Sequence, residues 1–143
     1  MNQKTDLERF WKENFGFRDI ELKAFQEVDR ENFIPEQLRN SAYHDMPLPL
    51  LRGKTISQPT TVMIMTHALE LEPGEKVFEI GTGSGYQAAI IANIVGENGK
   101  VISTEIIDDL VKFAQENIKK LNLKNVKIIK HDGSKGYEKE APY

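Results

Sequence analysis

Residues 77–87 read VFEIGTGSGYQ, a short apolar run followed by three glycines at alternate positions. The run predicts a buried strand, and Gly81, Gly83 and Gly85 predict a loop whose backbone turns tightly or passes close to a ligand. A phosphate-binding P-loop would place a Lys and a Ser or Thr after its last glycine, whereas an aromatic residue and an amide stand there. The loop therefore does not fit a P-loop.

Downstream of the glycines, helical and strand patterns alternate. The sequence predicts a helix in SGYQAAIIANIVG, a strand in KVISTEI, a helix in DDLVKFAQENIKKL and a strand in NVKIIKHDG. With KVFEI ahead of the loop, this order predicts parallel βαβ units, an α/β fold with a doubly wound, mostly parallel, Rossmann-like sheet. Ligands bind such sheets beyond the carboxyl ends of the strands, where the glycine loop, Glu105 and residues 131–133 fall.

The upstream part has a different pattern. Amphipathic helices are predicted at 5–15 and 18–30, and a short helix after Pro35. The prolines and glycine of residues 44–58 predict a long irregular loop. Another helix is predicted from Pro59 to Pro73-Gly74, with Ser57 or Gln58 as its N-cap.

We therefore expect one structural domain with two parts. Residues 1–58 form a helical and loop segment that contributes to the active site, and residues 59–143 form the first part of a cofactor-binding domain. The run EKE at 138–140 predicts a solvated turn.

Composition narrows the classes of function. At 143 residues with 39% hydrophobic content, the chain can bury a core. Its 19 basic and 22 acidic residues give a net charge of −3, which disfavours a nucleic-acid partner. With no cysteine and no long apolar stretch, the sequence predicts a soluble cytoplasmic protein without a membrane partner. The three histidines have no metal-ligand spacing, so no metal is expected.

Two ligand classes remain for the glycine loop. The dinucleotide fingerprint GxGxxG would need its third glycine one position later, which weakens that reading without excluding it. An acid two residues before GxGxG, Glu79, with an acid ending the second strand, Glu105, is the arrangement of class I S-adenosylmethionine methyltransferases. Glu105 would accept hydrogen bonds from the ribose hydroxyls, Asp132 from the adenine amino group, and Glu79 would support the loop or the cofactor's ammonium. Each feature alone also has a purely structural explanation. The glycines would fit a tight turn between strand and helix, and each acid would fit a solvated cap at a strand end.

Four stretches resemble the protein-L-isoaspartate O-methyltransferase family: YHDMPLPL at 43–50, GKTISQPTTVMIM at 53–65, EIGTGSGYQAAIIANIVG at 79–96 and HDGSKGYEKEAPY at 131–143. The resemblance implies methyl transfer from S-adenosyl-L-methionine to the free carboxylate of L-isoaspartyl residues in damaged proteins, which begins their repair. It implies Ser57 as the active-site residue, the alternative being a plain helix N-cap. The cofactor-binding residues it implies are Thr55, Ile56, Ser57, Glu79, Gly81, Thr82, Gly83, Gly85, Gln87, Glu105, Ile106, Asp132 and Gly133.

Family members continue past the APY at 141–143 into further strands, whereas this sequence predicts three. The first strand, which is central in the family, would then have an open edge. We expect that edge to favour self-association or to need another polypeptide, and the chain alone to show little methyltransferase activity because the substrate-side wall is missing. The alternatives are another class I methyltransferase, acting on a small molecule or RNA, and a truncated relative that binds cofactor or a partner without catalysis.

Overall fold

The structure, a computed structural model, describes residues 3–143. Its helices and strands, in chain order, are α1 (Gln3–Asn14), α2 (Asp19–Glu27), β1 (Leu48–Pro49), β2 (Thr55–Ile56), α3 (Pro59–Ala68), β3 (Lys76–Ile80), α4 (Tyr86–Val95), β4 (Lys100–Glu105), α5 (Asp108–Lys120) and β5 (Val126–Lys130). Short 3-10 helices lie at Arg30–Phe33, Glu36–Ser41, Leu51–Gly53, Gly133–Lys135 and Glu138–Glu140. The predicted βαβαβ order is confirmed.

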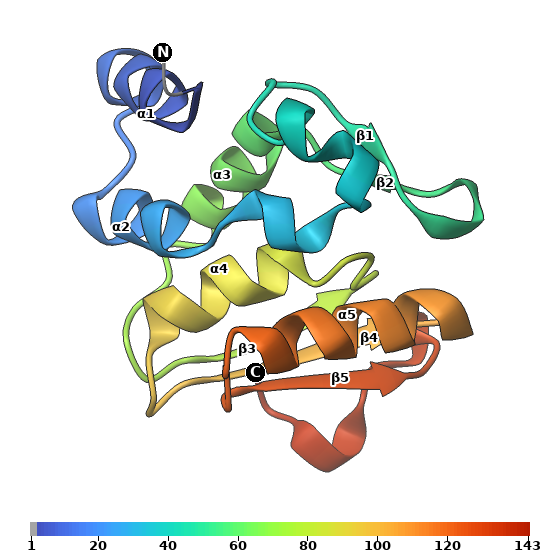
Figure 1. Cartoon of the computed structure of the whole chain (residues 1–143). Helices are drawn as coiled ribbons and strands as arrows, with labels where there is room; N and C mark the ends of the chain where they lie inside the picture. Colours follow the sequence, from blue (N-terminus) through green and yellow to red (C-terminus); the bar gives the residue numbers. More distant parts are fainter. Residues whose placement is uncertain (1–2) are drawn as a thin grey trace.

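The main sheet has three parallel strands in the order β3-β4-β5. α4 and α5 lie on one of its faces, and α1–α3 pack beyond α4 (Figure 1). Central β4 is buried along most of its length, which fits its apolar and small residues. Within residues 3–143, β3 pairs with β4 alone. Its other edge is open, as the sequence predicted.

The segment after β5 lies on the face opposite α4 and α5 (Figure 1). The ring of Tyr143 stacks on that of Phe78 in β3, with 4.7 Å between centroids. Glu140 draws this segment against the sheet, because its carboxylate and its carbonyl accept hydrogen bonds from lysines on all three strands: Lys76, Lys100 and Lys127. The bonds from Lys100 and Lys127 lower the pKa of Glu140 to about 2. The prediction of a solvated turn at 138–140 is therefore wrong for Glu140, which is bonded to the sheet.

The N-terminal helices join the same apolar core as α4. Trp11 of α1 is fully buried, its ring 4.6 Å from that of Phe25 in α2. The indole nitrogen donates to Thr60 Oγ1 of α3 at 2.7 Å. Burying the aromatic side chains removes a large apolar area from water, which holds this segment on the rest of the chain.

The region predicted as an irregular loop contains a small ribbon. Leu48 pairs with Ile56, and Pro49 with Thr55, so β1 and β2 are antiparallel. A hydrogen bond from Leu50 N to Lys54 O closes the ribbon at 2.7 Å. A proline is tolerated here because a two-stranded ribbon leaves one side of each strand without a partner. The prediction of no regular structure was therefore wrong for these residues.

The start of α3 at Pro59 agrees with the prediction, whereas its end does not. The helix ends at Ala68, because Glu70 adopts a left-handed conformation with φ of 51°. Its N-cap is Gln58, which makes no side-chain capping bond. The cap is supplied from a distance by Asp45, whose Oδ1 accepts a hydrogen bond from Thr60 N at 3.0 Å. Ser57 therefore does not cap this helix.

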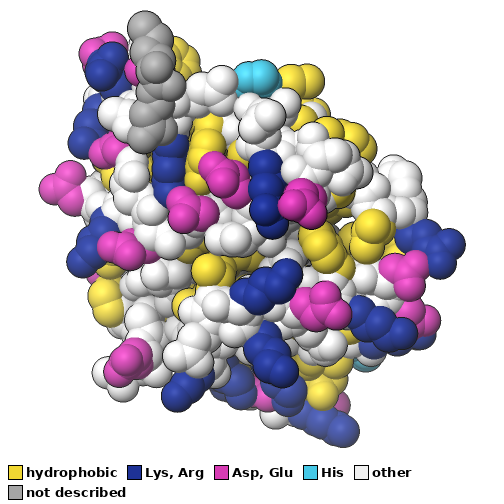
Figure 2. All heavy atoms as spheres, viewed as in Figure 1, with side chains coloured by type: hydrophobic (Ala, Val, Ile, Leu, Met, Phe, Trp, Pro, Cys, Tyr) yellow, Lys and Arg dark blue, Asp and Glu magenta, His cyan; other side chains and the backbone are white. Residues whose placement is uncertain are grey.

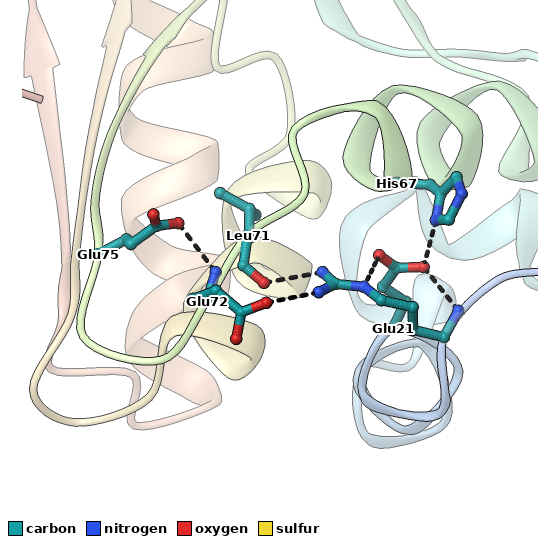
Figure 3. A network of polar contacts seen from close by, with 6 residues as sticks. Glu21, His67, Leu71, Glu72 and Glu75 are labelled. Carbon is teal, nitrogen blue, oxygen red and sulfur yellow. Dashed lines mark hydrogen bonds and ion pairs between the residues drawn. The ribbon is translucent and has the colours of Figure 1, made fainter.

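A polar network joins α2 to the end of α3 and to the connection that leads into β3 (Figure 3). The fully buried carboxylate of Glu21 accepts from Arg18 Nε and lies 2.8 Å from His67 Nδ1. Arg18 also donates to Glu72 and to the carbonyl of Leu71. Burial would raise the pKa of Glu21, but the hydrogen bonds from Arg18 and His67 lower it overall.

On the face drawn in Figure 2, acidic and basic side chains are interspersed. None of the helices within residues 3–143 is long and apolar enough to cross a membrane.

Candidate functional site

The glycine loop leaves the carboxyl end of β3 and leads into α4. All three glycines have positive φ: 88° at Gly81, 57° at Gly83 and 88° at Gly85. Gly81 and Gly83 have open space where a Cβ would stand, whereas a Cβ on Gly85 would come within 3.4 Å of Ala114 in α5. The first two glycines therefore leave room for a ligand, whereas the third is favoured by its left-handed backbone, since a Cβ there would make only an ordinary contact.

The loop is fastened to the end of β4. The amides of Gly81 and Thr82 donate to the carbonyl of Thr104 at 2.8 and 3.0 Å. The amide of Gly83 donates to Glu105 Oε2 at 3.0 Å. Glu105 Oε1 accepts from the two amides that follow β4, at 2.9 and 3.1 Å. A carboxylate offers about four acceptor positions, so Glu105 keeps about one for a ligand.

A second carboxylate lies behind the loop. Ser103 Oγ donates to Glu79 Oε1 at 2.5 Å, and Thr82 Oγ1 lies 2.5 Å from the same serine oxygen. Burial raises the pKa of Glu79 to about 7. The hydrogen bond from Ser103 lowers this pKa in part, and repulsion by the Glu105 carboxylate raises it further. Glu79 can therefore change its charge near neutral pH.

A cavity of about 440 Å³ opens at the carboxyl ends of the three strands. Seven of the thirteen predicted cofactor residues line it: Thr55, Gly81, Gly83, Glu105, Ile106, Asp132 and Gly133. A smaller cavity of about 70 Å³ adjoins it, sharing three lining residues, and five more of the predicted residues line this one: Ile56, Ser57, Glu79, Thr82 and Gln87. Gly85 lines neither cavity.

Several lining residues escaped the sequence reasoning. Ile80, Thr104 and Ser134 are chain neighbours of predicted residues, so their places at strand ends were a usable signal. Leu110 reaches the large cavity from α5, and no local pattern marks it. Within residues 3–143, no group of three or more His, Asp or Glu is arranged to hold a metal ion.

The turn after β5 completes the wall of the large cavity. Asp132 Oδ1 accepts from both the amide and the hydroxyl of Ser134, which lowers the pKa of Asp132. A Cβ on Gly133 would lie 2.4 Å from Thr104 Oγ1, so only glycine fits this close against β4.

Ser57 follows β2 directly and faces the smaller cavity. The residue is exposed, and its hydroxyl makes no hydrogen bond within the part of the chain that the structure describes. Its carbonyl accepts from Arg30 Nη2 at 2.9 Å. The main chain of Ser57 is thus held while its hydroxyl remains available.

The family model of protein-L-isoaspartate(D-aspartate) O-methyltransferase matches residues 3–143. The chain belongs to this family. Protein-L-isoaspartate O-methyltransferase 2 of Archaeoglobus fulgidus is 53% identical over 85% of this chain and 55% of that protein. The protein-L-isoaspartate O-methyltransferase of Methanopyrus kandleri is 50% identical over 85% of this chain and 54% of its own length.

Solved structures of the isoaspartate methyltransferase family show the same fold. The match with one protein-L-isoaspartate O-methyltransferase structure covers 98% of this chain and 45% of that protein's chain, with 32% identity and a TM-score of 0.87. A second structure, from Plasmodium falciparum, is described as a methyltransferase of this kind in complex with S-adenosyl-L-homocysteine. The match covers 97% of this chain and 67% of that protein's chain, with 31% identity and a TM-score of 0.79. This chain spans about half the length of the curated relatives it matches.

Proposed function

We propose that the chain carries the cofactor site and the serine segment of an S-adenosyl-L-methionine-dependent methyltransferase that acts on L-isoaspartyl carboxylates. One observation supports the proposal above all: the glycine loop, Glu105 and the segment Thr55–Ser57 line two adjoining cavities at the carboxyl ends of the strands. Family membership and the S-adenosyl-L-homocysteine bound to the Plasmodium falciparum relative supply the chemistry.

The residues present fit this cofactor. Gly81 and Gly83 have open space where side chains would stand, so the backbone can lie close to a ligand. Glu105 has an acceptor position left for a ribose hydroxyl, and a second hydroxyl could replace the bond from Gly83 N. When bound, the cofactor supplies an electrophilic methyl group on its sulfonium.

The chemistry needs no general base. A substrate carboxylate with a pKa near its reference value of about 4 is already ionised at pH 7. The contribution of the chain is alignment, which can lower a barrier by about 7 to 11 kcal/mol at its upper limit. We assign to the Ser57 hydroxyl a hydrogen bond to the substrate carboxylate. It is not a nucleophile, because it has no hydrogen bond to a base within residues 3–143.

Residues 1–58 supply the substrate contact through Ser57 and, through Thr55, Ile56 and Ser57, part of the wall around the cofactor. Residues 59–143 supply the rest of the cofactor site. The partners are isoaspartyl proteins or peptides in the cytoplasm, and the open edge of β3 is a place for self-association.

Two measurements on the full chain test the proposal. Calorimetry should show binding of S-adenosyl-L-homocysteine, and a labelled-methyl assay should show slow transfer to an isoaspartyl peptide but none to its aspartyl counterpart. Binding with transfer only to other acceptors would indicate another class I methyltransferase. Binding without any transfer would indicate a relative that holds cofactor without catalysis, and absence of binding would refute the cofactor site.

A further inference from the structure

Arg30 is a fully buried charged side chain next to the substrate segment. It begins the 3-10 helix Arg30–Phe33 and has 0% exposure. Burial lowers the pKa of the Arg30 guanidinium, and the charge of Asp45 is among the effects that raise it. Arg30 nevertheless forms no ion pair within residues 3–143. Burying a guanidinium without a carboxylate partner lowers the stability of the fold, unless hydrogen bonds from its N–H groups offset the loss of hydration.

The donors of Arg30 go to three main-chain carbonyls. Nη1 donates to Ala42 O at 2.5 Å, and Nη2 donates to Met46 O at 3.1 Å and to Ser57 O at 2.9 Å. Two of these carbonyls precede β1 and the third follows β2. One rigid, forked group thus ties together both ends of the ribbon that carries Thr55–Ser57. A lysine ammonium has three donors on a point charge and cannot reproduce this fork.

The 3-10 helix that begins with Arg30 also packs against the start of α4. Tyr86, the residue after Gly85, lies close enough that it and Arg30 shift each other's pKa. The ring of Tyr86 is 5.4 Å from that of Phe33, and its hydroxyl, like Arg30 Nε, is buried without a hydrogen-bond partner within residues 3–143. Tyr86 also lines the smaller cavity together with Ser57. The 3-10 helix Arg30–Phe33 thus contacts the serine segment through Arg30 and the start of α4 through Phe33.

We propose that Arg30 is a positioning residue, which fixes Ser57 relative to the glycine loop by holding the carbonyls of Ala42, Met46 and Ser57. The effect of Arg30 on turnover rests on the proposed function of Ser57, whereas its anchoring of the three carbonyls does not. Arg30 touches neither substrate nor cofactor in this role. Its loss should leave the glycine loop and Glu105 in place and loosen the segment that carries Ser57.

The test compares Arg30→Met and Arg30→Lys with two controls in the full chain. Val28→Ala removes buried methyl groups from the same segment without touching the three carbonyls, and Arg39→Met removes an exposed arginine nearby. Amide hydrogen exchange should be about tenfold or more faster at residues 46–58 in Arg30→Met than in Val28→Ala, with α4 unchanged. Arg30→Lys should restore this protection only in part, and Arg39→Met should match the wild type.

Kinetics supply the second measurement. In Arg30→Met, the KM for an isoaspartyl peptide should rise about tenfold or more, whereas the affinity for S-adenosyl-L-homocysteine should fall much less, because the glycine loop and Glu105 keep their places. Equal exchange at 46–58 in Arg30→Met and Val28→Ala, or equal loss of peptide and cofactor affinity, would overturn the proposal. If Arg30→Met does not fold, Arg30→Lys is judged by the same criteria. If the wild-type chain transfers no methyl group, the proposed function fails, and the exchange comparison still decides the role of Arg30.

Discussion

Replacing Glu79 with Gln should change how folding stability depends on pH. Glu79 is partly buried behind the glycine loop, and burial together with repulsion by Glu105 raises its pKa from 4.5 to about 7. A carboxyl whose pKa is higher in the folded chain favours folding while it is protonated. Its contribution is fully present below about pH 4.5 and is lost as the pH rises through about 7.

The size of the effect follows from this rise in pKa. At about 1.4 kcal/mol per pKa unit, the ionised carboxylate destabilises the fold by at most about 3 kcal/mol. Gln keeps the shape and the bond with Ser103 but cannot ionise. We therefore expect the free energy of unfolding of Glu79→Gln to exceed that of the wild type by up to about 3 kcal/mol at pH 8.5, and to lie within about 1 kcal/mol of it at pH 4.

Urea denaturation at several pH values measures this difference, and Asp108→Asn provides a control of opposite sign. The hydrogen bond from Lys130 lowers the pKa of Asp108, so its contribution is present at high pH and lost as the pH falls. Asp108→Asn should thus become less stable relative to the wild type as the pH rises. A difference between Glu79→Gln and the wild type that is the same at every pH would refute the assignment of Glu79 as a group that ionises near neutrality.

Four further outcomes are expected. Glu105→Ala should weaken S-adenosyl-L-homocysteine binding by about 1.5 to 3 kcal/mol per charged hydrogen bond lost, and unchanged affinity by calorimetry would contradict a ribose contact. Ser57→Ala should reduce methylation of an isoaspartyl peptide about ten- to hundredfold without changing cofactor affinity; since Ser57 caps no helix, a loss of stability with full turnover would be inconsistent with its proposed role. Asp45→Ala should lower the free energy of unfolding by about 1 to 2 kcal/mol through loss of the α3 cap, which thermal denaturation can measure. The open edge of β3 should make the mass of the purified chain rise with concentration in light scattering, and a monomer at every concentration would argue against self-association.

The part of the fold that the sequence predicted best is the part governed by local pattern. The strands beginning at Lys76 and Lys100 and the helices between strands have apolar periodicities that point to one structure. Glycines at alternate positions after β3 could only mark a special turn, and the positive φ at each of them agrees. Local residue types thus sufficed for the βαβαβ unit.

The parts that the sequence could not give depend on partners far along the chain. Asp45 caps α3 across the ribbon, so its role has no signature near Pro59. Glu140 becomes an ion-pair centre only because three strand beginnings meet at one end of the sheet. Arg30 looked like any charged residue of an amphipathic helix, and only tertiary structure shows its burial.

The position of Trp11 makes the N-terminal segment observable on its own. It is the one tryptophan of the chain, and its indole is bonded to Thr60 at the seam between α1 and α3. Its emission therefore reports whether water reaches that seam, while circular dichroism reports the helices and strands together. A shift to longer wavelength that precedes the loss of ellipticity in a denaturant series would show the segment lifting from an otherwise folded sheet, without any label attached to the protein.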